Sequence, residues 1–250
     1  MKKKYGIRIG ICIATVLLTA CTKTIGESKK TDRPPQEQII SCTAIMPEKE
    51  KNYPTIAALM AETDDVIYAE ITNVRYEHSE HGAIYTATTW KVLEDIFGDF
   101  QAGDTVEVYK DGGYMTVKER IDSYETEEMR KAAKQEALKE MTEEELSQRY
   151  SGYFMEGDSD PMIGDRSVLF LKKGWSPSFP DDYVRIGGSE GEYIQVKDGS
   201  FCSTGNLPSD QIRSLIEGGA ELPDGAPLPD FYSLDEIKTM LSTLSIPIKE

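Results

Sequence analysis

The sequence predicts a mainly β protein of the α+β class: a small β barrel with a helical insertion and C-terminal helices. Three observations lead to this expectation. Residues 65–76 are rich in β-branched and aromatic side chains, which suit a pleated, half-buried surface. Residues 84–97 alternate between two faces over the length of a strand. Good helix formers gather instead at 126–149 and again near the C-terminus, outside the alternating runs.

The first two predicted strands form the centre of the barrel. Ile67, Ala69 and Ile71 share one face, whereas Val74 falls on the other parity, so we expect a β-bulge near Thr72 and Asn73. The polar residues 77–82 connect this strand to the next one as a hairpin.

A turn and a third strand should follow. Residues 98–104 read as a turn, and Val106 and Val108 alternate in the third strand. Residues 111–113, Asp-Gly-Gly, predict another turn, after which 114–117 form a short fourth strand. Later strands are predicted at 166–171, 183–186 and 192–196, with a glycine-rich turn at 187–191.

Helices are expected before, between and after these strands. Pro54 starts a short helix that ends at Glu62. The insertion, residues 125–150, contains a capping box that begins at Thr142, and its thin apolar stripe predicts little burial. We therefore expect either a solvated decoration or a partner-binding arm. Residues 206–250 form a C-terminal helical extension that should pack on the barrel, which itself spans 54–205.

Residues 1–20 have the composition of a signal peptide. Basic residues come first, and the apolar run Ile9–Leu17 that follows is too short to span a bilayer comfortably. Leu18–Cys21 then resembles the bacterial lipobox, which implies cleavage before Cys21 and attachment of fatty acid, such as palmitate, to that cysteine. The alternatives are an ordinary signal peptide or a short anchor helix.

Residues 21–53 lack sustained apolar periodicity and contain Pro34–Pro35, so they predict a flexible tether. About 30 flexible residues have an end-to-end distance on the order of 30 Å. Ile39, Ile40 and Ile45 are apolar exceptions that could dock on the core.

The charge of the chain restricts its partners. The formal charge is −16, and removal of the four basic residues within 1–20 takes it to −20. Such acidity argues against binding nucleic acid or an anionic lipid surface, and it favours solubility or a basic partner. Membrane attachment is therefore expected through Cys21 alone.

Two cysteines remain once Cys12 has left with the signal peptide and Cys21 has been acylated. Cys42 and Cys202 form an even pair in an exported protein, which predicts either a disulfide or two isolated thiols.

No catalytic or metal constellation is recognised. His78 and His81 are a lone pair without further ligands. Residues 156–161 and Asp181–Asp182 are acidic turns that lack the full EF-hand pattern. Ser189 does not lie in a nucleophile-elbow sequence. We therefore predict no cofactor, no metal and no catalytic residue.

The order of these motifs is similar to that of exported bacterial β-barrel proteins of uncharacterised function and, more distantly, of netrin-like modules of the OB-barrel type. The resembling segments are Asp64–Ile71, Trp90–Gly98, Gly103–Val108 and Gly164–Leu171. The resemblance implies an OB-like barrel. Netrin-like inhibitors use a free N-terminal cysteine to chelate a protease zinc, and an acylated Cys21 would not serve that purpose.

Together these features predict a lipid-anchored lipoprotein on the extracytoplasmic face of the cell membrane. We expect a non-catalytic binding or envelope-interaction module with a protein partner. The alternatives are an envelope hydrolase and a loop-type protease inhibitor. A pocket with convergent acids and perturbed pKa values would favour the enzyme, and an exposed apolar patch would favour the binding module.

Overall fold

The computed structural model describes residues 30–45, 51–78, 83–174, 182–205, 207, 209–218 and 229–244. The predicted signal peptide, Cys21, His81 and Asp181 lie outside these residues. The protein is mainly β, as predicted. The strands are β1 (Lys30–Thr31), β2 (Ile39–Ile45), β3 (Asp65–His78), β4 (Ile84–Phe97), β5 (Thr105–Thr116), β6 (Tyr150–Met155), β7 (Arg166–Lys173), β8 (Tyr183–Arg185), β9 (Glu192–Gln195), β10 (Phe201–Ser203) and β11 (Phe231–Tyr232).

The α-helices are α1 (Ile56–Met60), α2 (Val117–Asp122), α3 (Glu127–Ala137), α4 (Glu143–Leu146), α5 (Ser209–Glu217) and α6 (Leu234–Thr243), and two short 3₁₀ turns are η1 (Gln36–Gln38) and η2 (Gly188–Gly191).

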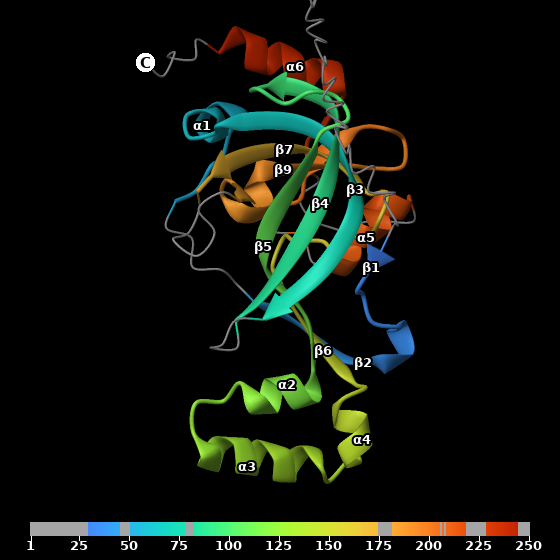
Figure 1. The fold of residues 1–250 in the computed structure, drawn as a ribbon. Coiled ribbons are helices and arrows are strands. Elements are labelled where there is room, and N and C mark those ends of the chain that lie inside the picture. The colour runs from blue at the N-terminus through green and yellow to red at the C-terminus, as the bar shows by residue number, and fades with distance from the viewer. Residues whose placement is uncertain are drawn as a thin grey trace, which may run out of the picture.

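Five strands at the centre of the molecule each pair with the next in the spatial order β3, β4, β5, β8 and β7 (Figure 1). β3 pairs antiparallel with β4, β4 antiparallel with β5, and β5 parallel with β8. β8 pairs antiparallel with β7, and β7 pairs antiparallel with β3. The register between β3 and β4 shifts between Ile71 and Asn73, which confirms the predicted bulge.

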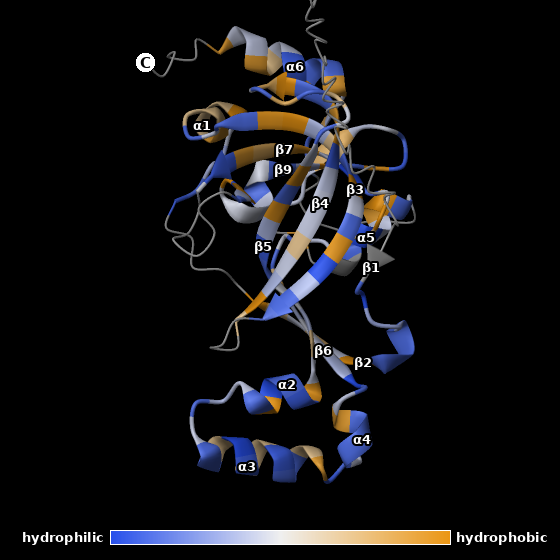
Figure 2. Cartoon of the chain, viewed as in Figure 1, coloured by the Kyte–Doolittle hydropathy of each residue, from blue (hydrophilic) through white to orange (hydrophobic). Residues whose placement is uncertain are grey.

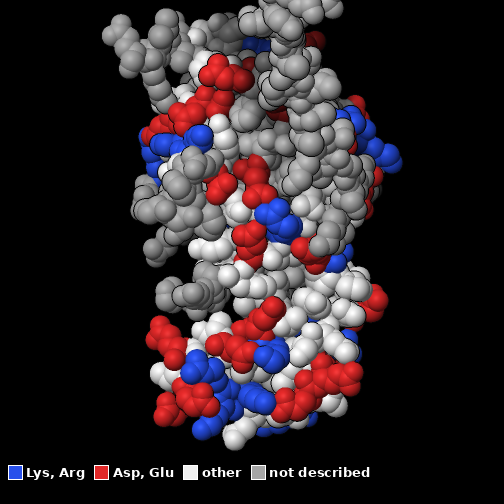
Figure 3. All heavy atoms as spheres, in the orientation of Figure 1, with Lys and Arg blue, Asp and Glu red and all other residues white. Residues whose placement is uncertain are grey.

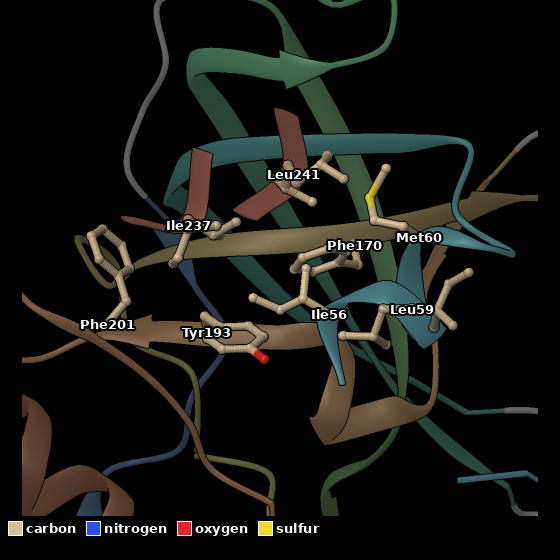
Figure 4. Packing of buried hydrophobic residues seen from close by; sticks show 11 residues of the cluster. Ile56, Leu59, Met60, Phe170, Tyr193, Phe201, Ile237 and Leu241 are labelled. Atoms are coloured by element: carbon tan, nitrogen blue, oxygen red, sulfur yellow. The ribbon is translucent and has the colours of Figure 1, made fainter. Parts of the chain in front are cut away.

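Two apolar clusters lie on either side of β3 and β7, because alternate side chains of a strand point to opposite faces. One cluster includes Ile67, Trp90 and Leu169. The other includes Val66 and Phe170, against which α1 and α6 pack their buried residues Leu59, Ile237 and Leu241 (Figure 4). The C-terminal helix therefore packs on the β core, as its apolar spacing predicts.

The predicted turn at 111–113 is wrong, because β5 continues through it. β5 leaves β4 after Asp111, which pairs with Tyr85, and Gly112 then begins its pairing with β6. Gly112 and Gly113 have φ angles of +92° and +145°, a backbone that side-chain-bearing residues rarely adopt. A Cβ on Gly112 would lie 2.3 Å from the carbonyl oxygen of Tyr153. The two glycines therefore let one strand pass from one sheet to another.

Beyond this bend, β5, β6 and β2 form a three-stranded sheet that we call the neck. The neck carries α2, α3 and α4, which we call the arm (Figure 1). The arm has its own small core around Val117, Ile121 and Leu146. The insertion therefore begins at Val117 and not at residue 125, and the predicted capping box between Thr142 and Glu145 is present.

Residues 30–45 differ from the flexible tether that their composition predicts. β1 pairs parallel with β3, and β2 pairs parallel with β6 along its whole length. Ile40 and Ile45 are exposed and do not dock in the core, contrary to expectation. Backbone pairing, together with the buried Pro34 and the ion pair of Arg33 with Asp160, thus orders a segment whose apolar pattern is too weak to predict a strand.

Candidate functional site

Residues 156–165 form an acidic strap whose aspartates are each held by a different arginine. Asp158 pairs with Arg185, and Asp160 with Arg33, both at 2.7 Å. The third aspartate pairs with an arginine of α5, Arg213 to Asp165, also at 2.7 Å. The predicted acidic turn at 156–161 is therefore an ion-paired segment, and most of it is buried, including Asp158 and Ser159.

The first of these pairs belongs to a buried charged network. The Arg185 side chain is only 5% exposed, and it donates to Glu192 as well as to Asp158. Burial opposes the guanidinium charge, but the two carboxylates outweigh it and raise the pKa of Arg185. Ser167 Oγ donates to Glu192 Oε1 at 2.8 Å. One guanidinium thus faces two carboxylates in this network, and each of the three charged groups has a hydrogen-bond partner.

Lys110 lies beside this network. Its Nζ donates to the backbone carbonyl of Ser159 in the strap at 2.7 Å. Burial lowers the pKa of Lys110, against the attraction of Asp158 and other nearby carboxylates. Lys110 therefore ties β5 to the strap.

A second polar cluster surrounds the Asp160 carboxylate. It accepts hydrogen bonds from Tyr114 Oη at 2.8 Å and from Tyr76 Oη at 3.3 Å. Cys42 of β2 lies near the cluster, and burial, followed by the charge of Asp160, raises the pKa of its thiol. A raised pKa leaves less of the nucleophilic thiolate at neutral pH.

An open basin of about 470 Å³ adjoins the strap. It is bordered by carboxylates, among them Asp111, and by cations such as Lys172, with the glycine loop Gly187–Gly188 along one side. Burial, followed by the charge of Asp158, raises the pKa of Asp111. The basin is therefore a polar pocket with a perturbed acid.

The arm offers a different kind of surface. Charged side chains of both signs interleave over it (Figure 3), and its helices are largely hydrophilic (Figure 2). α3 buries no residue, and its Met129 and Leu138 side chains are 48% and 37% exposed. A cleft of about 350 Å³ separates α2 and α3 from β2, with Ile40, Ile121 and Ala137 among its apolar lining.

Other residues singled out in the sequence do not converge on a site. His78 Nε2 lies 3.2 Å from the carbonyl oxygen of Tyr114. Ser189 Oγ donates to the carbonyl oxygen of Gly205 at 3.2 Å. Among the described residues, no group of three or more His, Cys, Asp or Glu side chains could hold a metal ion.

The predicted alternative of a disulfide between Cys42 and Cys202 is not realised, since both are free thiols in the structure. Cys202 is fully buried in an apolar cluster with Ile194 and Ile212, whereas Cys42 is exposed on the neck. Burial raises the pKa of Cys202 to about 12.

The arginines that organise the strap were not recognised in the sequence. Arg33, Arg185 and Arg213 lie far apart in the sequence. A basic residue in a short strand can be buried, like Arg185, or exposed, like Arg166, so the sequence gives no signal that identifies these partners.

Comparisons with protein-family models, curated proteins and solved structures find no match to this chain. Within the described ranges, none of the helices has the length and apolar character that crossing a membrane requires.

Proposed function

We propose that the protein is a lipid-anchored lipoprotein on the extracytoplasmic face of the cell membrane, and that it binds a protein partner through its arm without catalysis. The basic start, the apolar run and the lipobox that ends at Cys21 support the anchor. Because the anchored end precedes the β core, the lipid would hold the folded part next to the membrane.

We also propose that the β core is an OB-like barrel. OB folds are five-stranded, partly open Greek-key barrels. The support here is the series of pairings β3–β4–β5–β8–β7 that returns to β3. In a simple up-and-down barrel all neighbouring strands are antiparallel. The parallel pairing of β5 with β8 departs from that arrangement. In this scheme the arm is an insertion between β5 and β7.

The observation that supports the binding role is the exposure of two separate apolar side chains on the arm. α3 makes its limited contacts with α2 and α4, yet Met129 and the residue that follows the helix, Leu138, are exposed to solvent. A helix that stands away from the main core adds little stability to it, so its apolar side chains are available for a partner. The surrounding carboxylates and ammonium groups would form a polar rim.

A photo-crosslinking amino acid at Met129 is expected to capture a partner protein in intact cells. The matched control places the same group at Phe231, which is 44% exposed on β11, outside the arm. Crosslinked products are separated on gels and identified by mass spectrometry. Equal products from both positions, or none from Met129, would contradict binding through the arm.

Cys21→Ala is expected to abolish fatty-acid attachment and to release or mislocalise the protein. The lipobox supplies the acylated cysteine, and a lipid chain contributes about 0.8 kcal/mol of membrane affinity per buried CH₂ group. Metabolic labelling with an alkyne fatty acid and membrane fractionation measure both effects. Cys42→Ala serves as the control and should label like the wild type. Unchanged labelling of Cys21→Ala would refute the anchor.

A second candidate function, an envelope hydrolase, is favoured by one observation: the raised pKa of Asp111 beside the basin. A raised pKa lets a carboxyl keep its proton to a higher pH, which is the change that a general acid requires. Turnover of ester, amide or glycoside substrates that is lost in Asp111→Asn would support this candidate. Turnover that survives the substitution would exclude Asp111 as its acid.

A further inference from the structure

β2 presents an outer edge that, among the described strands, has no partner. It pairs only with β6, on one side. Six of its seven residues are exposed, and Figure 1 shows the strand at the neck, between the β core and the arm. An edge strand offers a row of backbone N–H and C=O groups to any strand that approaches it.

The sequence of β2 lacks most of the devices that protect such edges. Natural edge strands are shielded by charged side chains, by proline or by bulges. The seven residues Ile39–Ile45 contain no charged residue, no proline and no glycine. One register irregularity, between Ile39 and Ser41, is the single interruption of its pairing with β6. β2 is therefore well suited to accept another strand.

We propose that β2 pairs antiparallel with β2 of a second copy of this chain, about a two-fold axis at Cys42. The two necks would then join in one continuous six-stranded sheet, ordered β5–β6–β2 in one protomer and β2–β6–β5 in its partner. Such an interface is isologous, because each copy contributes the same strand. This inference is independent of the proposed role of the arm.

The order of side chains along β2 fits this symmetry. Cys42 is the central residue of the strand. Antiparallel pairing about it places each residue opposite one of the same kind: Ile39 faces Ile45, Ile40 faces Ala44, Ser41 faces Thr43, and Cys42 faces Cys42. Apolar pairs and hydroxyl pairs directly opposite each other stabilise antiparallel strands by about 0.2–1 kcal/mol each.

The strand itself brings no charge against a second copy. The chain carries a formal charge of −16, so two copies repel each other over most approaches. β2 brings no charged side chain to the contact, so like charges do not meet across the new strand pair. A basic partner strand, in contrast, would find no carboxylate on β2 to pair with.

Analytical ultracentrifugation of the detergent-solubilised, full-length lipoprotein tests the proposal over a series of concentrations. We expect a reversible dimer that tightens as salt rises, because salt screens the repulsion between two acidic copies. Thr43→Lys should weaken the dimer at least tenfold, since it places like charges next to the two-fold axis. Met129→Lys, an equally exposed change on the arm, should leave the dimer intact.

Crosslinking through Cys42 tests whether the two β2 strands meet at this residue. A short bismaleimide should join two copies through Cys42, and Cys42→Ser should abolish the crosslinked dimer. If Thr43→Lys unfolds the protein, as shown by circular dichroism, Ala44→Glu replaces it in the ultracentrifuge. A protein that stays monomeric at all concentrations would overturn the proposal. So would a dimer that Thr43→Lys and Ala44→Glu leave unchanged, or a bismaleimide product that joins Cys42 to a different protein.

Discussion

Arg185→Met is expected to lower the free energy of unfolding by about 3–5 kcal/mol, which is the usual cost of removing one partner from a buried ion pair. Arg185 compensates both Asp158 and Glu192, and its side chain is almost fully buried. Methionine fills much of the same space but removes the guanidinium that donates hydrogen bonds to both carboxylates. Urea unfolding followed by circular dichroism measures the loss.

Arg166→Met is the matched control for this prediction. Arg166 also pairs with a glutamate, Glu70, but its side chain is 46% exposed. Exposed ion pairs contribute about 0–1 kcal/mol, so we expect a small change. Equal losses in Arg185→Met and Arg166→Met would show that the buried network is not a major source of stability.

Gly112→Ala is expected to destabilise the protein by more than about 2 kcal/mol, because two costs add. A residue with a side chain in the left-handed region costs about 1–2 kcal/mol. The new methyl group would also meet the Tyr153 carbonyl oxygen at 2.3 Å, which forces β5 and β6 apart. Unfolding curves measure the total, and hydrogen exchange at Gly152 and Phe154 should report weakened pairing at the neck.

Gly103→Ala separates the two costs. Gly103 also has a positive φ, +99°, but a Cβ there meets no atom within 4 Å. This control should show only the conformational cost of about 1 kcal/mol. If Gly112→Ala is no worse than Gly103→Ala, the close approach of β5 to β6 is not what fixes the bend.

The strands that alternate regularly were predicted correctly from the sequence. Each of β3 and β4 has one face whose buried apolar residues repeat with a period of two, as Ile67 and Ile71 do in β3 and Trp90 and Val92 do in β4. The bulge near Thr72 followed from a change in that parity. A double glycine, in contrast, predicts a turn by its local preference, and only the long-range pairing of Gly112 with Phe154 shows that β5 continues.

β2 and β6 were missed for different physical reasons. β2 is exposed on both faces, so its side chains leave no alternating pattern to recognise. β6 is the six-residue run YSGYFM, in which neither the apolar residues nor the burial alternates, so it has no strand pattern to recognise. The acidic residues 156–161 were recognised in the sequence, but the partners of the strap, Arg33, Arg185 and Arg213, come from distant parts of the chain. Local preferences carry no information about such pairs.

The pairing of Thr116 with Tyr150 has a consequence for the order of folding. The ends of the arm are held side by side by β5 and β6, so the whole of 117–149 acts as a short connection once the neck has formed. Loop-closure entropy grows with the number of flexible residues between two contacts. If the neck forms before β7 meets β3, fewer flexible residues separate Asp65 from Leu171. This pair is the contact between those two strands with the largest sequence separation. The arm should thus slow the search for this contact less than its length alone implies.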